Sequence, residues 1–374
     1  MMTRRGIIIL VASVILDAFF LADVIFFGAS LFQKTQVPAF PSAAPASDIA
    51  VFAENLSIPW EIAFLPDGDM LVTERPGTVK RIGKNKRTYT ISGVAHRGEG
   101  GLLGLAIHPR FIENRWIYLY LTTRHGDSLV NRVERYRLAD DALSERTEII
   151  TNIPGASIHD GGRIAFSPDG FLFITTGDAN QSKSAQDKNS LAGKILRIRD
   201  DGSIPTDNPF GNAVWTYGHR NPQGLAWDDR GRLWATEHGR SIPLSGYDEI
   251  NLIEKGKNYG WPDIQGDSTK TGMEKPVIHS GPYDTWAPAG AAFAGGSIFF
   301  GGLKGEALYE LPVSGDDVGS LKKHLSETFG RIRAVAKGPD GLLYISTSNT
   351  DGRGTPHLHD DKIISIDPTA LESR

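Results

Sequence analysis

The amino-acid sequence predicts an all-β fold: a six-bladed β-propeller of four-stranded antiparallel blades, preceded by an N-terminal hydrophobic helix. Three observations lead to this prediction. The 374 residues include 42 glycines and 21 prolines, a proportion typical of many tight turns. A pattern of strand, turn and strand recurs from Trp60 onward. A closed all-β architecture can also take up most of this length in one domain.

The N-terminal segment, residues 1–30, is predicted to be a signal peptide or a membrane anchor. Arg4 and Arg5 precede an apolar stretch from Gly6 to about Gly28, which is long enough to cross the hydrocarbon core. Positive residues before such a stretch favour export of the chain after it. We expect an uncleaved anchor, and small residues at 28–30 leave cleavage open. The predicted location is extracytoplasmic, either periplasmic or at the cell surface.

A linker and one large domain come after this segment. Residues 31–47 are rich in proline, alanine and serine, a composition typical of linkers. The propeller is therefore predicted to occupy residues 48–374. Its net charge gives no reason to expect a nucleic-acid partner, since the whole chain carries a formal charge of −4. The absence of cysteine excludes disulfides, thiolate metal sites and cysteine nucleophiles.

Six segments share an alternating apolar strand, a turn such as Pro-Asp-Gly, and a second short apolar strand. They begin at Trp60, Leu103, Gly162, Gln223, Ala291 and Ile332. In residues 167–170 and 338–341, proline sets φ at the second turn position and glycine relieves steric conflict at the fourth, so both are predicted hairpin turns. We expect a strand at 49–53 to pair with one at 362–367, because radial closure protects sheet edges.

Four inter-strand segments carry more polar and charged residues than a turn requires: 98–104, 159–163, 218–224 and 248–251. In a propeller, such segments crowd one end of the central channel. Together with residues 258–262 and Trp286, they resemble the soluble glucose dehydrogenase and aldose sugar dehydrogenase family, which uses pyrroloquinoline quinone (PQQ). The resemblance extends from about residue 57 to 367. Its most specific part is the order GHRNPQG, DEIN and NYGWP.

His159 is the predicted catalytic base. It precedes Asp-Gly-Gly-Arg and matches the catalytic histidine of that family. Oxidation of a sugar at its anomeric carbon removes a hydroxyl proton while hydride leaves the carbon, and a neutral imidazole can accept such a proton. A histidine considered alone is more often structural. His219 is expected to support the loop that carries Arg220 rather than to transfer protons.

The resemblance also implies a cofactor site. Arg220 and Asn221 match the family pair that contacts the quinone, and Arg220 would stabilise oxygen charge during the reaction. Lys304, Arg331 and Arg333 match the cradle for the three carboxylates of PQQ, which guanidinium groups can bind through paired hydrogen bonds. Without the resemblance, the two arginines at 331 and 333 would be interpreted as a solvated strand edge.

Calcium is implied by the resemblance and not by a spacing rule, since the sequence contains no EF-hand loop. Glu249 and the backbone carbonyl of Tyr259 match positions for a structural ion. Gly239 and Arg240 match the pair whose carbonyls hold the ion that bridges to the quinone, where it would act as a Lewis acid. This chain departs from the family at that place. Family members often have proline where this chain has Arg240, and residues 241–245 are an insertion. An acidic turn without metal is the alternative for Glu249.

Two further positions, Glu99 and Trp286, are predicted to touch cofactor and sugar. Glu99 stands where the best-known family members have glutamine. An ionised carboxylate beside a tricarboxylate is unfavourable, so we expect Glu99 to be protonated, paired with a cation or turned away. Trp286 offers an apolar face for a sugar ring, and core packing is the alternative.

These matches together imply a PQQ- and calcium-dependent enzyme. It would oxidise an aldose to the lactone, with His159 as base and Arg220 as the assisting cation, and pass electrons to an external acceptor. Two alternatives remain open, because a fold does not determine a function. One is a propeller lactonase, which needs no cradle for a tricarboxylate. The other is a noncatalytic, membrane-tethered propeller that binds glycans or proteins.

Overall fold

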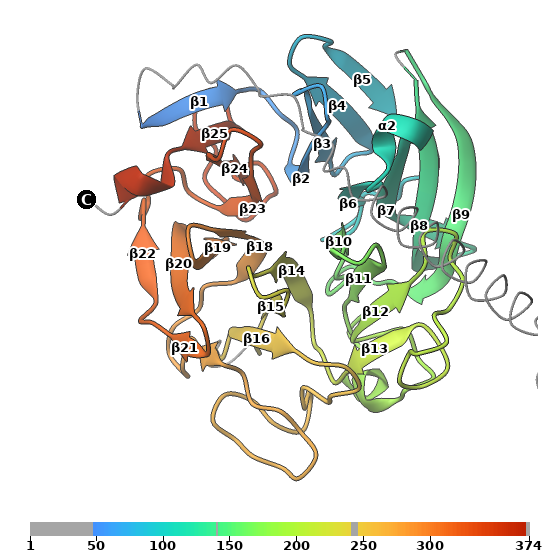
Figure 1. The fold of residues 1–374 in the computed structure, drawn as a ribbon, viewed down its shortest axis with the longest axis vertical. Helices are drawn as coiled ribbons and strands as arrows, with labels where there is room; N and C mark the ends of the chain where they lie inside the picture. Colours follow the sequence, from blue (N-terminus) through green and yellow to red (C-terminus); the bar gives the residue numbers. More distant parts are fainter. Residues whose placement is uncertain (1–47, 140, 241–245, 372–374) are drawn as a thin grey trace, which may run out of the picture. The chain divides into compact units, whose positions relative to one another are not determined.

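The computed structural model describes residues 48–139, 141–240 and 246–371. These residues form six antiparallel sheets placed radially around one axis (Figure 1), which confirms the predicted six-bladed β-propeller. The predicted N-terminal helix or anchor, residues 1–30, and the linker, 31–47, lie outside the described residues. Within the described ranges, no helix is long and apolar enough to cross a membrane.

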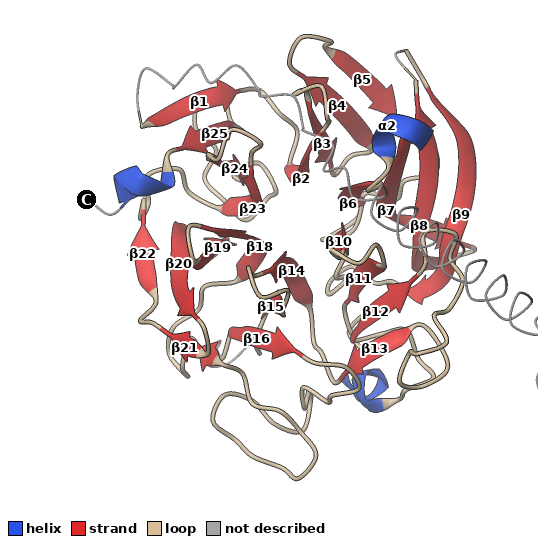
Figure 2. Ribbon diagram, in the orientation of Figure 1, coloured by secondary structure: helices blue, strands red, loops and turns tan. Residues whose placement is uncertain are grey.

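Each blade is a meander whose first strand lies nearest the axis. Blades 1 to 3 consist of β2 (Pro59–Phe64), β3 (Met70–Glu74), β4 (Thr78–Ile82) and β5 (Arg87–Thr90); β6 (Leu102–Ile107), β7 (Trp116–His125), β8 (Ser128–Leu138) and β9 (Leu143–Pro154); and β10 (Ile164–Phe166), β11 (Leu172–Thr176), β12 (Lys194–Ile198) and β13 (Val214–Tyr217). Figure 2 shows that helices contribute little to these blades.

Blades 4 to 6 repeat this arrangement with one departure, because both β21 and β22 pair with β20. They consist of β14 (Pro222–Trp227), β15 (Leu233–Glu237), β16 (Glu249–Ile253) and β17 (Ile278–His279); β18 (Pro288–Ala294), β19 (Ser297–Gly302), β20 (Ala307–Ser314), β21 (Asp317–Val318) and β22 (Lys322–His324); and β23 (Ile332–Lys337), β24 (Leu343–Thr347), β25 (Ile363–Ile366) and β1 (Ile49–Ala53). The described short helices are α2 (Phe111–Asn114) and the 3-10 turns η1 (Ser182–Gln186) and η2 (Pro368–Leu371).

The predicted turns and the predicted ring closure are confirmed. The amide of Gly170 donates to the carbonyl of Ser167 at 2.9 Å, and that of Gly341 donates to Gly338 at 3.1 Å. Strand β1 pairs with β25, and Ile49 lies opposite Ile366. The first strand of the described chain therefore completes the blade formed by the last strands, and this pairing closes the ring.

The hydrophobic core lies between neighbouring blades. Leu71 of blade 1 and Leu119 of blade 2 are fully buried in one cluster, and Tyr120 of blade 2 packs with Ile174 of blade 3 in another. Truncating such a side chain typically costs about 2–5 kcal/mol. This packing holds the blades in register, and so it fixes the loops that the blades carry.

Candidate active site

Most predicted functional residues lie at one end of the channel, which we call the loop end. Adjacent strands are antiparallel, so the start of each first strand lies beside the end of the second. Connections into first strands therefore meet connections that leave second strands. The former are residues 54–58, 91–101, 155–163, 218–221, 280–287 and 325–331, and the latter are 75–77, 126–127, 177–193, 238–240 with 246–248, 303–306 and 348–362.

His159 forms a buried pair with Asp178, a residue that sequence reasoning missed. The imidazole Nδ1 lies 2.8 Å from a carboxylate oxygen of Asp178, and Trp261 donates to the other oxygen at 2.9 Å. Because the carboxylate accepts from Nδ1, the neutral ring carries its lone pair on Nε2. Gly177 makes this approach possible, since a Cβ there would lie 1.9 Å from the carbonyl oxygen of His159.

Arg220 and Asn221 are buried beside this pair. The amide of Asp178 donates to the carbonyl of Arg220 at 2.8 Å, and the Arg220 guanidinium lies 5.5 Å from the Trp261 ring centre. Burial lowers the pKa of Arg220 from its usual value, and the nearby carboxylates, Asp178 foremost, oppose this shift. The side-chain oxygen of Asn221 accepts from the amide of Gly161 at 3.0 Å, whereas its buried Nδ2 has no protein partner. That donor is available for a ligand.

The residues predicted to form the cradle are two buried arginines and one exposed lysine. Arg331 donates to Asp351 at 2.9 Å and to the carbonyl of Leu303 at 3.0 Å. Arg333 donates to Gln223 at 2.8 Å, and its Nε has no protein partner. Burial and then the charge of other arginines lower the pKa of Arg333 to about 9. Lys304 is exposed in the connection after β19, at the same end.

Glu99 is paired with a cation, which is one of the three states expected for it. One oxygen accepts from Arg353 at 2.7 Å, and the other accepts from the backbone amide of His159 at 2.9 Å. Burial alone would raise the pKa of Glu99, but the His159 amide, His238 and Arg353 together lower it to about 2. Glu99 is therefore ionised, and it holds the loop of His159 in place.

Three more loop-end residues were not predicted. Arg75 follows β3, His238 follows β15 and Arg353 follows β24. Burial lowers the pKa of Arg75, and burial lowers the pKa of His238 to about 4, so this histidine is neutral at physiological pH. Arg75 Nε and His238 Nε2 are buried without a protein partner. Their positions after second strands are the signal that could have found them.

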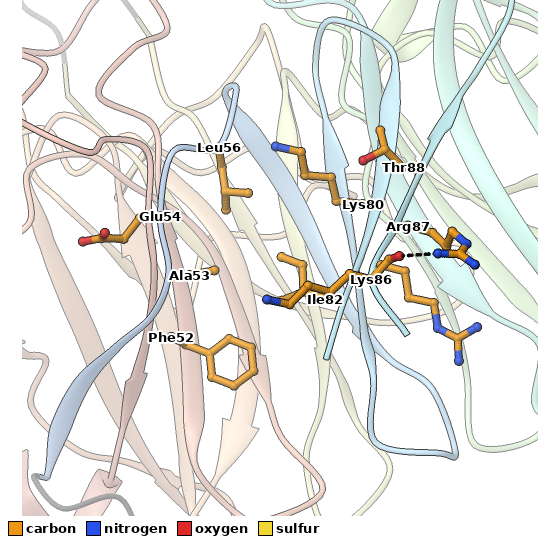
Figure 3. Close-up of a pocket in the computed structure, with 10 residues that line it drawn as sticks. Phe52, Ala53, Glu54, Leu56, Lys80, Ile82, Lys86, Arg87 and Thr88 are labelled. Atoms are coloured by element: carbon orange, nitrogen blue, oxygen red, sulfur yellow. Dashed lines mark hydrogen bonds between the residues drawn. The ribbon is translucent and has the colours of Figure 1, made fainter. Parts of the chain in front are cut away.

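A small cavity of about 20 Å³ joins several of these residues. Its lining consists of Trp60, Glu99, Leu103, Asp160, Gly161, Gln223, His238, Leu303, Arg333 and Arg353. A second cavity, of about 610 Å³, lies between β1 and the strands β4 and β5 (Figure 3). No predicted site residue lines that larger cavity. Glu99 and Arg333, in contrast, line the smaller one.

Glu249 lies in an arrangement that suits a hard cation. It stands opposite Glu237 in the β15–β16 register. Burial, followed by the charge of Glu237, raises the pKa of Glu249 to about 8. Asn251 donates to Glu249 at 3.2 Å, but its own side-chain oxygen is buried without a protein partner. Among the described residues no three His, Cys, Asp or Glu side chains form a metal cluster, so an ion here would also need backbone oxygens such as the Tyr259 carbonyl.

Gly239 and Arg240 are held by close backbone packing. The Gly239 amide donates to Asp248 at 2.8 Å, and a Cβ at Gly239 would lie 2.3 Å from backbone atoms of Tyr247. Arg240 is exposed and forms a β-bridge with Gly246. The insertion that separates these two residues, 241–245, lies outside the described residues.

Trp286 and His219 both have structural surroundings. Trp286 is 5 % exposed, and its ring lies 5.8 Å from the rings of Phe300 and Tyr309 within a core cluster. This favours the alternative of core packing over contact with a sugar. His219 is fully buried, with Nδ1 2.8 Å from Glu237, and supports its loop as expected.

The family model for Glucose / Sorbosone dehydrogenase matches residues 56–358, more than half of the chain. The chain belongs to this family. Membership confirms the resemblance inferred from the loop motifs and makes the protein an oxidoreductase. It favours a sugar dehydrogenase over the propeller lactonase and the noncatalytic binding module.

Two relatives and one solved structure each match more than half of this chain. Aldose sugar dehydrogenase YliI of Escherichia coli is 37 % identical over 353 residues, which are 83 % of this chain and 92 % of that protein. Quinoprotein glucose dehydrogenase B of Acinetobacter calcoaceticus is 33 % identical over 257 residues, 59 % of this chain and 53 % of that protein. The PQQ-bound structure of an aldose sugar dehydrogenase from Streptomyces coelicolor matches with a TM-score of 0.78 and 40 % identity, covering 85 % of this chain and 97 % of that one.

Proposed function

We propose that this member of the glucose/sorbosone dehydrogenase family oxidises an aldose at its anomeric carbon to the lactone, with PQQ and calcium as cofactors. The observation that carries the proposal is the His159–Asp178 pair at a channel end where buried arginines converge. The PQQ-bound relative from Streptomyces coelicolor and the aldose sugar dehydrogenase of Escherichia coli support the choice of cofactor and substrate class.

The loop end fits an anion that carries several carboxylates. In the described structure, neither Arg75 nor Arg333 makes an ion pair, although both are buried. Buried nitrogens of Asn221, His238 and both of these arginines lack protein acceptors. Carboxylate oxygens would supply such acceptors and offset the positive charge. Lys304, Arg331 and Arg333 would hold the carboxylates of PQQ, with Arg220 and Asn221 near its quinone oxygens.

His159 would remove the proton from the anomeric hydroxyl. Its Nε2 carries the free lone pair because Nδ1 is committed to Asp178. The Asp178 carboxylate would stabilise the imidazolium as it forms and fix the orientation of the ring. When bound, PQQ supplies the two-electron acceptor for the hydride that leaves the anomeric carbon. Loss of this proton and this hydride turns the carbon–oxygen single bond into the lactone carbonyl, and Arg220 would stabilise oxygen charge meanwhile.

Calcium would occupy oxygen-rich positions next to blade 4. The facing carboxylates of Glu237 and Glu249, with the unsatisfied oxygen of Asn251, are ligands that calcium prefers. Glu249 and the Tyr259 carbonyl would hold a structural ion, and the carbonyls of Gly239 and Arg240 would hold a second one, which supplies a Lewis acid. A calcium ion at Glu249 would also offset the repulsion that raises the pKa of this side chain.

We further propose that the propeller works outside the cytoplasm and delivers electrons to an external acceptor. The apolar stretch preceded by Arg4 and Arg5 supports an exported body that residues 1–30 anchor in the membrane. Protease added to intact spheroplasts would digest the propeller if this is correct. Full protection, with digestion only after lysis, would contradict it.

Reconstitution tests the proposed activity directly. The purified apo-protein should bind PQQ with an absorbance change, and addition of calcium and an aldose should then reduce an artificial dye. PQQ should also raise the unfolding temperature, because it binds only the folded state. A protein that shows neither absorbance change nor stabilisation at any PQQ concentration would not have this function.

Asp178→Asn should slow the reaction while leaving PQQ affinity unchanged within about twofold. The amide keeps the size of the side chain but no longer stabilises the imidazolium, so kcat should fall by roughly a hundredfold or more. A PQQ titration separates a role in proton removal from a structural one, because only a structural role would also disturb the cofactor site. A fall in PQQ affinity as large as the fall in kcat would show that Asp178 serves only to hold the structure.

Glu249→Gln should remove the stabilisation of the fold by calcium. In the metal-free protein the substitution removes one of two facing carboxylates, so the unfolding temperature should rise or stay the same. Calcium should stabilise the unaltered protein but shift the variant by less than about 1 °C. Glu148→Gln, at an exposed site on β9, is the control and should keep the calcium shift. Equal shifts in all three proteins would remove Glu249 from the ion site.

A further inference from the structure

We propose that Arg353 is the movable cover of the small cavity that reaches Arg333, held closed by Glu99, and that it becomes a contact for a carboxylate when an anionic cofactor binds. This inference rests on the proposed function, because PQQ is the ligand through which it is tested. It adds to the predicted cradle a residue that reaches the cavity from the loop between β24 and β25.

The first observation is the position of the ion pair. Glu99 and Arg353 are 254 residues apart, in the loops before β6 and after β24, and their side chains meet at 2.7 Å. Both line the small cavity at the loop end. The pair therefore connects blade 2 to blade 6 across the loops of blade 1, directly at the wall of the cavity.

The second observation is the size of the cavity. About 20 Å³ is enough for one water molecule but not for a carboxylate group. A lining residue must therefore move before a carboxylate of PQQ can reach Arg333 through this cavity. Arg353 is the exposed member of the lining, with 55 % of its side chain accessible, whereas the other nine are buried or intermediate. Exposed ion pairs contribute little to stability, so this one can open without unfolding the loops.

The third observation concerns what could open it. Glu99 stays ionised at all physiological pH values, because its pKa is about 2, so protonation does not release Arg353. Another carboxylate can do so, since it offers the guanidinium the same acceptor. Glu99 would then keep its second contact, the 2.9 Å hydrogen bond that the amide of His159 donates. This bond helps to hold the His159 backbone, which has a left-handed φ of 62°. Opening of the cover therefore leaves the loop of the base in place.

Rates of PQQ binding to the calcium-loaded apo-protein, followed by rapid-mixing absorbance, test this proposal. Glu99→Gln keeps an acceptor for the His159 amide but releases Arg353, so association should be roughly fivefold faster or more. Arg353→Ala should also accelerate association, and it should weaken affinity by about tenfold through faster dissociation, because a charged hydrogen bond to the ligand is lost. Arg137→Ala is the matched control, since Arg137 forms an exposed pair with Glu145 at 3.0 Å far from the cavity.

The double variant separates a cover from simple charge repulsion. If Glu99 acts by holding Arg353, then Glu99→Gln should change the association rate by less than about twofold once Arg353 is alanine. The same acceleration in both backgrounds would mean that Glu99 only repels the anionic ligand, and the proposal would be wrong. Binding rates of Arg353→Ala equal to those of Arg137→Ala would also overturn it. Absence of PQQ binding to the unaltered protein would instead contradict the proposed function itself.

Discussion

Replacement of His159 by alanine is expected to slow aldose oxidation by roughly a hundredfold to ten-thousandfold, the usual contribution of a positioned general base. Its imidazole is paired with Asp178 through Nδ1, so Nε2 is the atom that would take the hydroxyl proton. Affinity for PQQ should change little, because neither the arginines nor Asn221 depend on this side chain. Dye reduction under saturating sugar and a PQQ titration measure the two effects separately.

His125→Ala provides the control, since this exposed histidine at the end of β7 pairs with Ser128 and does not line the small cavity. It should retain the full rate. Retention of the full rate by His159→Ala would refute the assigned base. A similar loss of rate and of PQQ affinity in His159→Ala would indicate that the residue shapes the pocket and is not the base.

Replacement of Arg333 by methionine is expected to weaken PQQ binding by roughly a hundredfold or more. A buried guanidinium can donate two charge-assisted hydrogen bonds to a carboxylate, and methionine donates none. Without cofactor, the variant should be as stable as the unaltered protein or more so. Burial and neighbouring arginines lower the pKa of Arg333 to about 9, as expected for a cation that has no anion beside it. Spectroscopic titration and thermal unfolding give the two measurements.

Arg197→Met is the corresponding control at an equally buried arginine. Arg197 donates to Asp207 at 2.9 Å and to Asn208 at 3.1 Å, and it does not line the small cavity at the loop end. Its replacement should lower the unfolding temperature and leave PQQ affinity unchanged. If Arg333→Met instead destabilised the apo-protein and bound PQQ normally, this arginine would be structural.

The propeller could be predicted from the sequence because its signals are local. Alternating apolar residues specify a strand, and Pro-Asp-Gly specifies the turn to the next one, so each hairpin is encoded within about twenty residues. The Gly170 and Gly341 turns formed as predicted. Ring closure by β1 and β25 followed from the general need to protect sheet edges.

The candidate site could be predicted only in part. The resemblance led to His159, Arg220, Arg331 and Arg333, and the structure places all four at the loop end. Sequence motifs did not reveal Asp178, although it ends the third repeat segment. A single acidic residue after a strand carries no signal until its partner is known. Trp286, in contrast, was predicted as a sugar contact. Its burial against Phe300 depends on packing that no motif describes.

By itself, the sequence determined the number of blades, the hairpins within them and the loops that carry polar side chains. Only the tertiary structure decided which of those side chains meet. The Glu99–Arg353 pair exists because radial closure brings together two loops that are 254 residues apart. The His159–Asp178 pair exists because the antiparallel pairing of β10 with β11 sets the start of one strand beside the end of the other. The same closure buries Arg75 and Arg333, and burial is what makes their charges costly unless an anion is present. Local patterns specify strands, but electrostatics depends on distances that only the closed ring defines.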